Sequence, residues 1–390
     1  MFGLKKNWRL VSSSTLALII ASVLLATLGG CKNQSGGSEK IQIGAALPLT
    51  GSISFYGKPQ RKVLEMGVKE INQKGGINGK KVELMVEDSK STAKGGTNAV
   101  NNLLLRDPEI VITSLTIVTN ATQPILEKRK IPQVALSIHP SLAKQSKYTV
   151  RPYYGLEDEM EIWKKYISEK NYKRLSVVWA KSPEQKAAIN KYLKPSLKKS
   201  EGRLAASTPF EIGASNVRSQ MSKIKSSNPN LVIAMDFGNV YERILSQAKV
   251  LNIHNEMASS IGILSAPPLD PKLTDGLVFT GPKFVIEQTD RYTSFKKRFE
   301  KKYKSSLSYD TIYAYDALKM CVKAMKKDGN TGKKFIESFT DMNEYKGISG
   351  KIVPKDNGNV SVDISMGVYD GSEISLLRDP RAVLDSIRAE

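Results

Sequence analysis

The sequence is poor in the residues that most enzymes use as nucleophiles, bases or metal ligands. Its 390 residues include only two cysteines and two histidines, and the histidines, His139 and His254, stand far apart. It has no HExxH zinc motif, no paired CxxC, no GxSxG nucleophile turn and no GxGxxG nucleotide fingerprint. The segment GGINGKK resembles a phosphate-binding loop only superficially, because Lys74 replaces the first required glycine and Lys81 the required serine or threonine. We therefore predict a protein that is not an enzyme and that needs no metal or cofactor.

The first cysteine ends an N-terminal segment that is typical of export. Three basic residues precede the apolar run STLALIIASVLLATL, which is short for a membrane-spanning helix, and LGG leads directly into Cys31. Small residues before a cysteine resemble a bacterial lipoprotein box. We therefore predict a signal peptide over residues 1–30, a lipid on Cys31 and a flexible linker over 31–39. The alternative is an ordinary signal peptide with a coincidental cysteine.

With Cys31 acylated, Cys321 has no partner, so no internal disulfide is expected. Cys321 lies on the apolar stripe of YAYDALKMCVKAMKK, which favours a buried side chain over a reactive thiol.

Acidic residues are in the minority. The chain has 59 Lys and Arg against 38 Asp and Glu, a formal charge of +21. The basic residues are spread along predicted helices, as in WKKYISEKNYKR and FKKRFEKKYK, so solvated helix faces explain most of the charge. Attraction to an anionic envelope surface is the weaker alternative, and salt would screen it. Since an exported protein does not normally meet nucleic acid, we expect none as a partner.

Apolar strand patterns alternate with amphipathic helix patterns along most of the chain. IQIGAAL, KKVELMVED, EIVIT and IPQVAL read as buried strands, and helical patterns separate them. The alternation begins again at Leu156 and becomes largely helical after Gly281. Strands that alternate with helices of this length predict an α/β fold with parallel sheets and right-handed crossovers.

Three loops that follow predicted strands carry hydroxyl side chains. They are LPLTGSISFYGKPQ (47–60), SLTIVTNATQP (114–124) and LSIHPSLAK (136–144). In open α/β sheets, ligands bind beyond the carboxyl ends of the strands, where such loops lead into helices. The sequence therefore predicts a binding edge made of these three loops.

The N-terminal part of the mature chain also carries a family signature. It consists of IGAALPLTG, then YG with a helix that ends in EINQKGGINGKKVEL, then the acidic EDS at the end of the second strand. In combination these motifs closely resemble the substrate-binding proteins of branched-chain amino acid ABC transporters, the leucine/isoleucine/valine-binding family. Weaker similarity continues through TQP, RILSQAKVLNI and DGLVFTGP.

The resemblance implies a type I periplasmic binding protein, with two Rossmann-like lobes of parallel sheet joined by a three-crossover hinge. Lobe 1 would comprise residues 40–154 plus 283–364, and lobe 2 residues 155–282 plus 365–390. Such a protein closes around one small molecule by hinge motion.

The resemblance also implies ligand-binding residues in lobe 1. Thr119, matched through TQP, would hold the ligand carboxylate; the alternative is that it only caps its helix. Ser137 and His139 would take the places of a backbone carbonyl and a threonine, although His139 is equally read as a plain loop histidine. Tyr56 would pack on the ligand side chain, or else belong to the core at the lobe edge.

Lobe 2 departs from the family pattern. The ligand-facing tyrosines of the family correspond to Glu184 or its neighbours and to Phe237. The acid that normally pairs with the ligand ammonium aligns near Ile261, which cannot do so, and burying an unpaired ammonium costs several kcal/mol. Asp236 is a substitute for that acid, or else a turn-capping aspartate.

We therefore predict an extracytoplasmic, lipid-anchored solute-binding protein of an ABC transporter. It would capture a branched-chain amino acid or a related small polar metabolite and deliver it to a membrane permease. Alternatives are a sensory or envelope interaction lipoprotein with the same fold, or a binder of amides or carboxylates.

Overall fold

The computed structural model describes residues 40–238, 240–328 and 332–377. The predicted signal peptide, the lipidation site Cys31 and the linker 31–39 lie outside the described residues, as does the end of the chain from 378. Among the helices of the described part, none is both long and apolar enough to cross a lipid bilayer.

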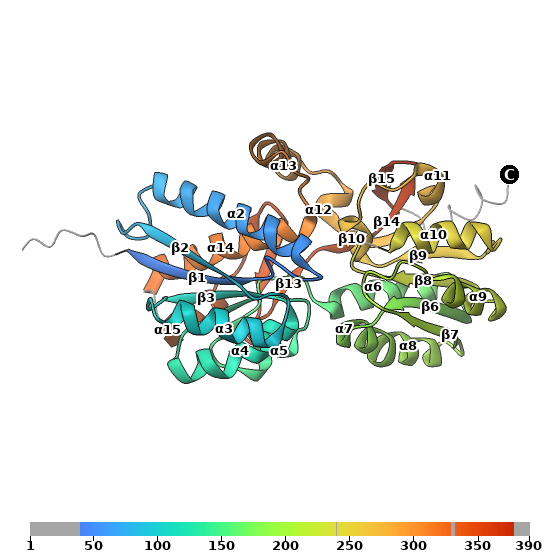
Figure 1. Ribbon diagram of the computed structural model, residues 1–390, viewed down its shortest axis with the longest axis horizontal. Helices are drawn as coiled ribbons and strands as arrows, with labels where there is room; N and C mark the ends of the chain where they lie inside the picture. The colour runs from blue at the N-terminus through green and yellow to red at the C-terminus, as the bar shows by residue number, and fades with distance from the viewer. Residues whose placement is uncertain (1–39, 239, 329–331, 378–390) are drawn as a thin grey trace, which may run out of the picture. The chain divides into compact units, whose positions relative to one another are not determined.

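The first sheet has five parallel strands in the order β2-β1-β3-β4-β5. They are β1 (Ile41–Leu47), β2 (Val82–Asp88), β3 (Ile110–Ser114), β4 (Gln133–Leu136) and β5 (Thr149–Val150). The helices that connect them are α2 (Ser54–Gln73), α3 (Ala93–Leu104), α4 (Thr116–Arg129) and α5 (Ser141–Gln145). Figure 1 shows α2 on one face of this sheet and α3 and α4 on the other. Both faces are therefore covered, which is why every residue of β1 except Gln42 is apolar.

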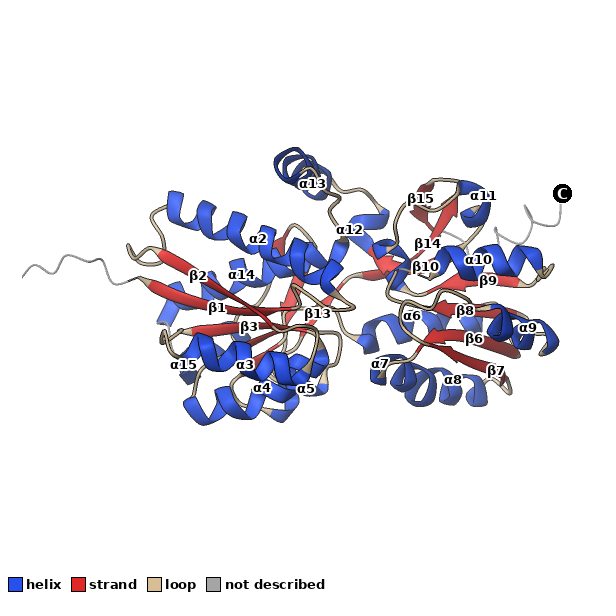
Figure 2. Ribbon diagram, viewed as in Figure 1, coloured by secondary structure: helices blue, strands red, loops and turns tan. Residues whose placement is uncertain are grey.

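The second sheet has seven strands in the order β15-β14-β10-β9-β8-β6-β7. Five are parallel: β6 (Arg174–Ala180), β7 (Arg203–Phe210), β8 (Leu231–Met235), β9 (Glu256–Ser259) and β10 (Val278–Pro282). Two antiparallel strands, β14 (Ile364–Asp370) and β15 (Glu373–Leu376), complete the edge. Its helices are α6 (Leu156–Glu169), α7 (Pro183–Ala187), the π-helical η1 (Ala188–Leu193), α8 (Lys194–Lys199), α9 (Arg218–Ser226), α10 (Tyr241–Val250), the 3₁₀ helix η2 (Ile261–Ser265) and α11 (Pro271–Thr274). Figure 2 shows the alternation of strands and helices in both sheets.

After β10 the chain returns to the first sheet, as its more helical sequence suggests. This part comprises α12 (Lys283–Ile286), α13 (Asp290–Tyr303), α14 (Tyr309–Asp328), α15 (Gly332–Thr340) and the antiparallel strands β11 (Tyr345–Gly347), β12 (Gly350–Pro354) and β13 (Val360–Val362). Helix α14 packs on α2, where a Cβ at Gly67 would lie 2.7 Å from Leu318 Cδ2, so the missing side chain permits the close approach. Cys321 of α14 is buried in this core.

The predicted α/β class with two lobes of mostly parallel sheet is confirmed, although β14 and β15 make the second sheet mixed. Within the described residues the chain passes between the two halves three times: from β5 to α6, between β10 and α13, and from β13 to β14.

Candidate functional site

A cavity of about 600 Å³ lies at the carboxyl ends of strands from both sheets. From the first sheet it receives the loops after β1, β3 and β4, which are the three loops that the sequence singled out, and also Ser91 from the loop after β2. From the second sheet it receives residues that follow β6, β7 and β8. Its walls are mostly apolar or aromatic: Ile53, Tyr56, Leu115, Ile117, Leu136, Ile138, Leu142, Tyr153, Tyr154, Ile212 and Phe237. Apolar walls with a few polar groups are typical of small-molecule sites.

The loop after β1 is held in shape by Asp88, the last residue of β2. The Asp88 carboxylate accepts hydrogen bonds from the backbone N–H of Leu49 at 3.0 Å and from the Thr50 hydroxyl at 2.6 Å. Burial by itself raises the pKa of Asp88, but these bonds and those from the Thr50 and Lys90 backbones outweigh it, so the pKa is lowered. The carboxylate therefore stays ionised and fixes the turn that presents Tyr56 to the cavity.

The loop after β3 brings a hydroxyl and a helix N-terminus to the cavity. Leu115, the residue before α4, has a left-handed φ of 76°, which is costly for a side chain that is not glycine. This backbone starts α4 at Thr116, whose hydroxyl lies 2.7 Å from that of Ser137. Thr116 and Ser137 both line the cavity, beside the unpaired backbone donors expected at the first turn of a helix.

Thr119 does not line the cavity, contrary to the expectation from the TQP match. It is fully buried, and its hydroxyl pairs with that of Thr113 at 2.9 Å. Because α4 begins three residues earlier, at Thr116, Thr119 is turned into the protein interior. It does not cap the helix either, since the cap position is Leu115.

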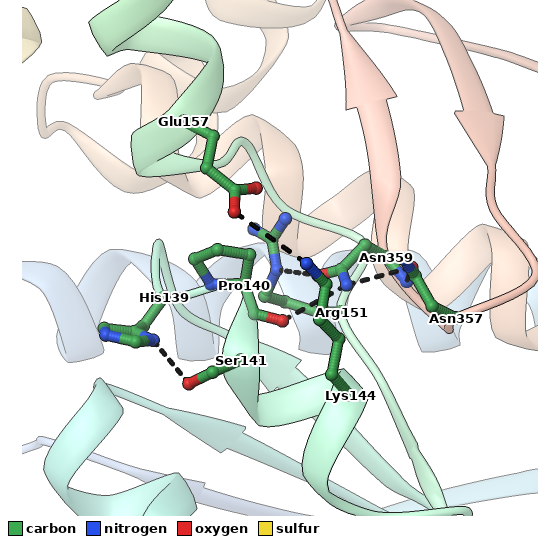
Figure 3. Close-up of polar contacts among 8 residues, drawn as sticks. All are labelled: His139, Pro140, Ser141, Lys144, Arg151, Glu157, Asn357 and Asn359. Atoms are coloured by element: carbon green, nitrogen blue, oxygen red, sulfur yellow. Dashed lines mark hydrogen bonds and ion pairs between the residues drawn. The ribbon is translucent and has the colours of Figure 1, made fainter. Parts of the chain in front are cut away.

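Ser137 and His139 both line the cavity, on the loop after β4. The His139 Nδ1 atom lies 2.7 Å from the Ser141 hydroxyl (Figure 3). Burial lowers the pKa of His139, Glu184 partly opposes this, and Lys191 and Arg151 lower it further. His139 is therefore a neutral, polar wall residue at neutral pH.

Arg151 braces this loop from behind. Its buried guanidinium donates to the carbonyls of Ser137 at 3.1 Å, Tyr153 at 2.7 Å and Tyr154 at 2.7 Å, and to Asn359 Oδ1 at 2.6 Å. Asn359 in turn donates to the Pro140 carbonyl at 3.2 Å (Figure 3). The cavity loop, the link from β5 to α6 and the turn before β13 thus share one buried cation.

Phe237 lines the cavity from the second sheet, as predicted for a wall residue. Its backbone carbonyl accepts a hydrogen bond from the Tyr56 hydroxyl at 3.2 Å, so residues from the two sheets meet here. Lys181, Ser182 and Glu184 complete this side at the start of α7.

Asp236 is placed as a turn-capping aspartate, one of the two interpretations that its sequence left open. It is 2% exposed and does not line the cavity. Its Oδ2 atom accepts from the backbone N–H of Gly238 at 3.0 Å and of Val240 at 2.8 Å, just before α10. The cavity carboxylate on this side is instead that of Glu184.

The sequence did not identify Gln60, Thr116, Tyr153 or Tyr154 as cavity residues. Thr116 lay in a quoted hydroxyl-rich loop, but the start of the helix was misplaced by one turn. The tyrosine pair in RPYYG was visible as two aromatics at the predicted link between the halves of the chain. Among the described residues, no group of three or more His, Cys, Asp or Glu side chains is placed to hold a metal ion.

Comparison with known proteins gives the family. The family model of the periplasmic binding proteins matches residues 40–371. The chain belongs to the periplasmic binding protein family. The predicted resemblance to the leucine/isoleucine/valine-binding proteins is confirmed by curated relatives. One is the leucine-, isoleucine-, valine-, threonine- and alanine-binding protein of Pseudomonas aeruginosa, 21% identical over 364 residues, which are 91% of this chain and 95% of that protein.

Solved structures agree on the type I fold. The substrate-binding protein LivJ of Streptococcus pneumoniae, in complex with isoleucine, has a TM-score of 0.76 at 20% identity over 87% of this chain and 99% of that one. A solute-binding protein of an ABC transporter from Rhodopseudomonas palustris, in complex with 3,4-dihydroxybenzoic acid, has a TM-score of 0.77 at 14% identity over 86% and 96%. This periplasmic binding protein is thus a member of a family of binding components, which places it outside the cytoplasm.

Proposed function

We propose that this protein is the extracytoplasmic solute receptor of an ABC transporter. It captures a branched-chain amino acid or a related small metabolite in the cavity of Tyr56 and Phe237 and delivers it to a membrane permease, while a lipid on Cys31 anchors it to the membrane. Lobe 1 is formed by residues 40–154 with 283–364, and lobe 2 by 155–282 with the C-terminal segment.

The observation that carries the proposal is the composition of the cavity. Apolar and aromatic walls enclose about 600 Å³, a volume that suits a small metabolite. Among the polar groups of the lining, the Thr116 and Ser137 hydroxyls lie 2.7 Å apart beside the N-terminus of α4. A helix N-terminus favours an anion, so this part of the cavity suits a carboxylate.

Glu184 is the candidate partner of a ligand ammonium. It lines the cavity at the start of α7, in lobe 2, whereas the Thr116 and Ser137 hydroxyls line it from lobe 1. It takes over the role that the sequence analysis offered to Asp236, whose carboxylate is occupied by backbone donors.

A second candidate ligand class is an aromatic carboxylate. Four aromatic residues, Tyr56, Tyr153, Tyr154 and Phe237, line the cavity, and aromatic rings stack favourably on one another. The Rhodopseudomonas palustris neighbour, described with 3,4-dihydroxybenzoic acid, is a precedent for the fold with such a ligand.

Thermal unfolding against a ligand panel tests the proposal. The panel holds leucine, isoleucine and valine, their des-amino carboxylates, short amides, and benzoates. A ligand at 1,000 times its dissociation constant adds about 4 kcal/mol to the free energy of unfolding. The amino-acid form is supported if leucine stabilises the wild type and Glu184→Gln lowers the affinity for leucine at least tenfold. The control Glu161→Gln, at an exposed site, should leave that affinity unchanged. Stabilisation by benzoates alone supports the second class, and no stabilisation by any member refutes both.

Transport is tested separately from binding. Crosslinking on intact cells identifies whether permease subunits or a sensor kinase contact the anchored protein. Recovery of a sensor kinase in place of a permease favours the sensory alternative.

A further inference from the structure

Gln60 presents an unused hydrogen-bond acceptor at the cavity. It lies near the N-terminal end of α2, lines the cavity and is 2% exposed. Its Oε1 atom is buried and has no hydrogen-bond partner among the described residues. A buried polar atom without a partner costs free energy, so such an atom in a ligand cavity marks a place where a bound molecule supplies the missing group.

Asp310 explains why the oxygen of the Gln60 amide is the unpaired end. The Gln60 Nε2 atom donates to Asp310 Oδ2 at 3.4 Å. An ionised carboxylate only accepts hydrogen bonds, so the NH₂ end of the amide must face Asp310 and the oxygen must face away from it. Asp310 is itself fully buried in the first turn of α14, where the helix dipole favours a negative charge, and it accepts from the Ser308 hydroxyl.

Three tyrosine hydroxyls around this place have partners. That of Tyr56 donates to the Phe237 carbonyl at 3.2 Å, and those of Tyr154 and Tyr309 lie 3.1 Å from each other. No donor of the described residues forms a hydrogen bond with Gln60 Oε1, and a donor among the contents of the cavity would supply one.

We propose that Gln60, oriented by Asp310, is a specificity-determining residue whose Oε1 accepts a hydrogen bond from an N–H or O–H group of the solute. The inference rests on the proposed function, because the proposed function assigns the ligand to this cavity. It adds that the solute carries a donor group beside its apolar body, whether an amine, an amide or a hydroxyl.

The test compares probes that differ only in the donor. The pairs are L-leucine with 4-methylpentanoate and 4-hydroxybenzoate with benzoate, measured by calorimetry at pH 8 on the wild type, Gln60→Leu and Gln60→Glu. We expect at least one of the two pairs to bind to the wild type. Within that pair, the member with the donor group should bind at least tenfold more tightly than the member without it. Gln60→Leu lowers this preference at least fivefold while the affinity for the donor-free member changes less than threefold, and Gln60→Glu, which keeps an acceptor oxygen, retains it; any preference for L-leucine that remains in Gln60→Leu is assigned to Glu184. Equal loss of both members in Gln60→Leu would show a merely structural role and overturn the inference.

The pH dependence gives a second readout. Burial raises the pKa of Asp310 to about 7. Protonated Asp310 becomes a donor, the amide is then free to turn, and the preference for donor-bearing probes falls between pH 8 and pH 5.5. The titratable groups that face Asp310 are Tyr56 from α2, Tyr153 from the link after β5 and Tyr309 from α14, and all three have raised pKa values, so they stay neutral over this range. In Asp310→Asn the change with pH disappears, which separates it from any titration of His139.

A crystal structure separates failure of the inference from failure of the proposed function. If no probe binds, the proposed ligand classes fail, and the structure of the unliganded protein then decides the inference. An ordered water or other solute donor within hydrogen-bond distance of Gln60 Oε1 supports it. A protein donor at that place overturns it.

Discussion

Replacing the buried Arg151 with methionine tests whether one cation holds the cavity loop to the two links between the sheets. Methionine keeps much of the apolar volume of the side chain but donates no hydrogen bond. In Arg151→Met, the carbonyls of Ser137, Tyr153 and Tyr154 and the amide oxygen of Asn359 all lose their donor. We expect a large loss of stability and weaker ligand binding, because Ser137 lines the cavity.

The magnitude follows from the contacts and from burial. Hydrogen bonds that involve a charged group are each worth about 1.5–3 kcal/mol, so the four together contribute roughly 6–12 kcal/mol. Against this, placing a guanidinium in the interior costs several kcal/mol. Burial lowers the pKa of Arg151 to about 10, so the group is still charged at neutral pH. The difference predicts a loss of about 3–5 kcal/mol, the range typical of removing one partner from a buried charged network.

Urea unfolding of the ligand-free protein, followed by tryptophan fluorescence, measures this loss from the midpoint and slope of the transition. The control is Arg106→Met, which removes an exposed arginine whose ion pair with Glu87 is worth about 1 kcal/mol at most. Asn359→Leu should be less than additive with Arg151→Met, since both remove the same hydrogen bond. A loss below about 1 kcal/mol for Arg151→Met, no larger than the control, would refute the bracing role.

Two further predictions concern Asp310 and Gly57. Because the pKa of Asp310 is raised from 3.8 to about 7, the folded protein keeps a proton that the unfolded chain releases, so its contribution to stability falls between about pH 4 and pH 7 and is constant above that range. The full effect on the free energy of unfolding is at most about 4 kcal/mol. Urea unfolding from pH 4.5 to 8 measures this free energy for the wild type and for Asp310→Asn, and the difference between the two should change with pH. A difference that stays constant contradicts the prediction. In Gly57→Ala the new Cβ would lie 2.2 Å from the Pro48 carbonyl oxygen, so we expect a loss of about 1–3 kcal/mol and weaker binding, while the exposed neighbour Lys58→Ala should be neutral in the same assays.

The loops that reach the cavity were predictable because parallel strands end at one edge of their sheet. LPLTGSISFYGKPQ, SLTIVTNATQP and LSIHPSLAK follow β1, β3 and β4, and each contributes side chains to the cavity. Tyr56, Ser137, His139 and Phe237 are among them. Periodicity also identified the buried face of α2, since Leu64, Val68 and Ile71 recur at helical spacing.

Thr119 shows where sequence reasoning ended. Hydroxyl residues occur at 116, 119 and 122, and the sequence does not state where the helix begins. Thr116 and Thr119 are three residues apart, nearly one helical turn, so they lie on similar faces of α4. Thr116 nevertheless lines the cavity, whereas Thr119 lies one turn further along, in the core. The helix starts at Thr116, directly after Leu115, whose backbone has a φ of 76°, and the sequence alone does not indicate this conformation.

By itself the sequence determined the α/β class, the family and the edge of the sheets at which the cavity lies, because these follow from periodicity and from motifs contiguous along the chain. The tertiary structure decided which side chains face the cavity. Asp236 is occupied by the amides of Gly238 and Val240, and Gln60 meets Asp310 across 250 positions of the sequence. The pairing of Gln60 with Asp310 depends on how the return of the chain after β10 packs α14 against α2, and no local pattern records that contact.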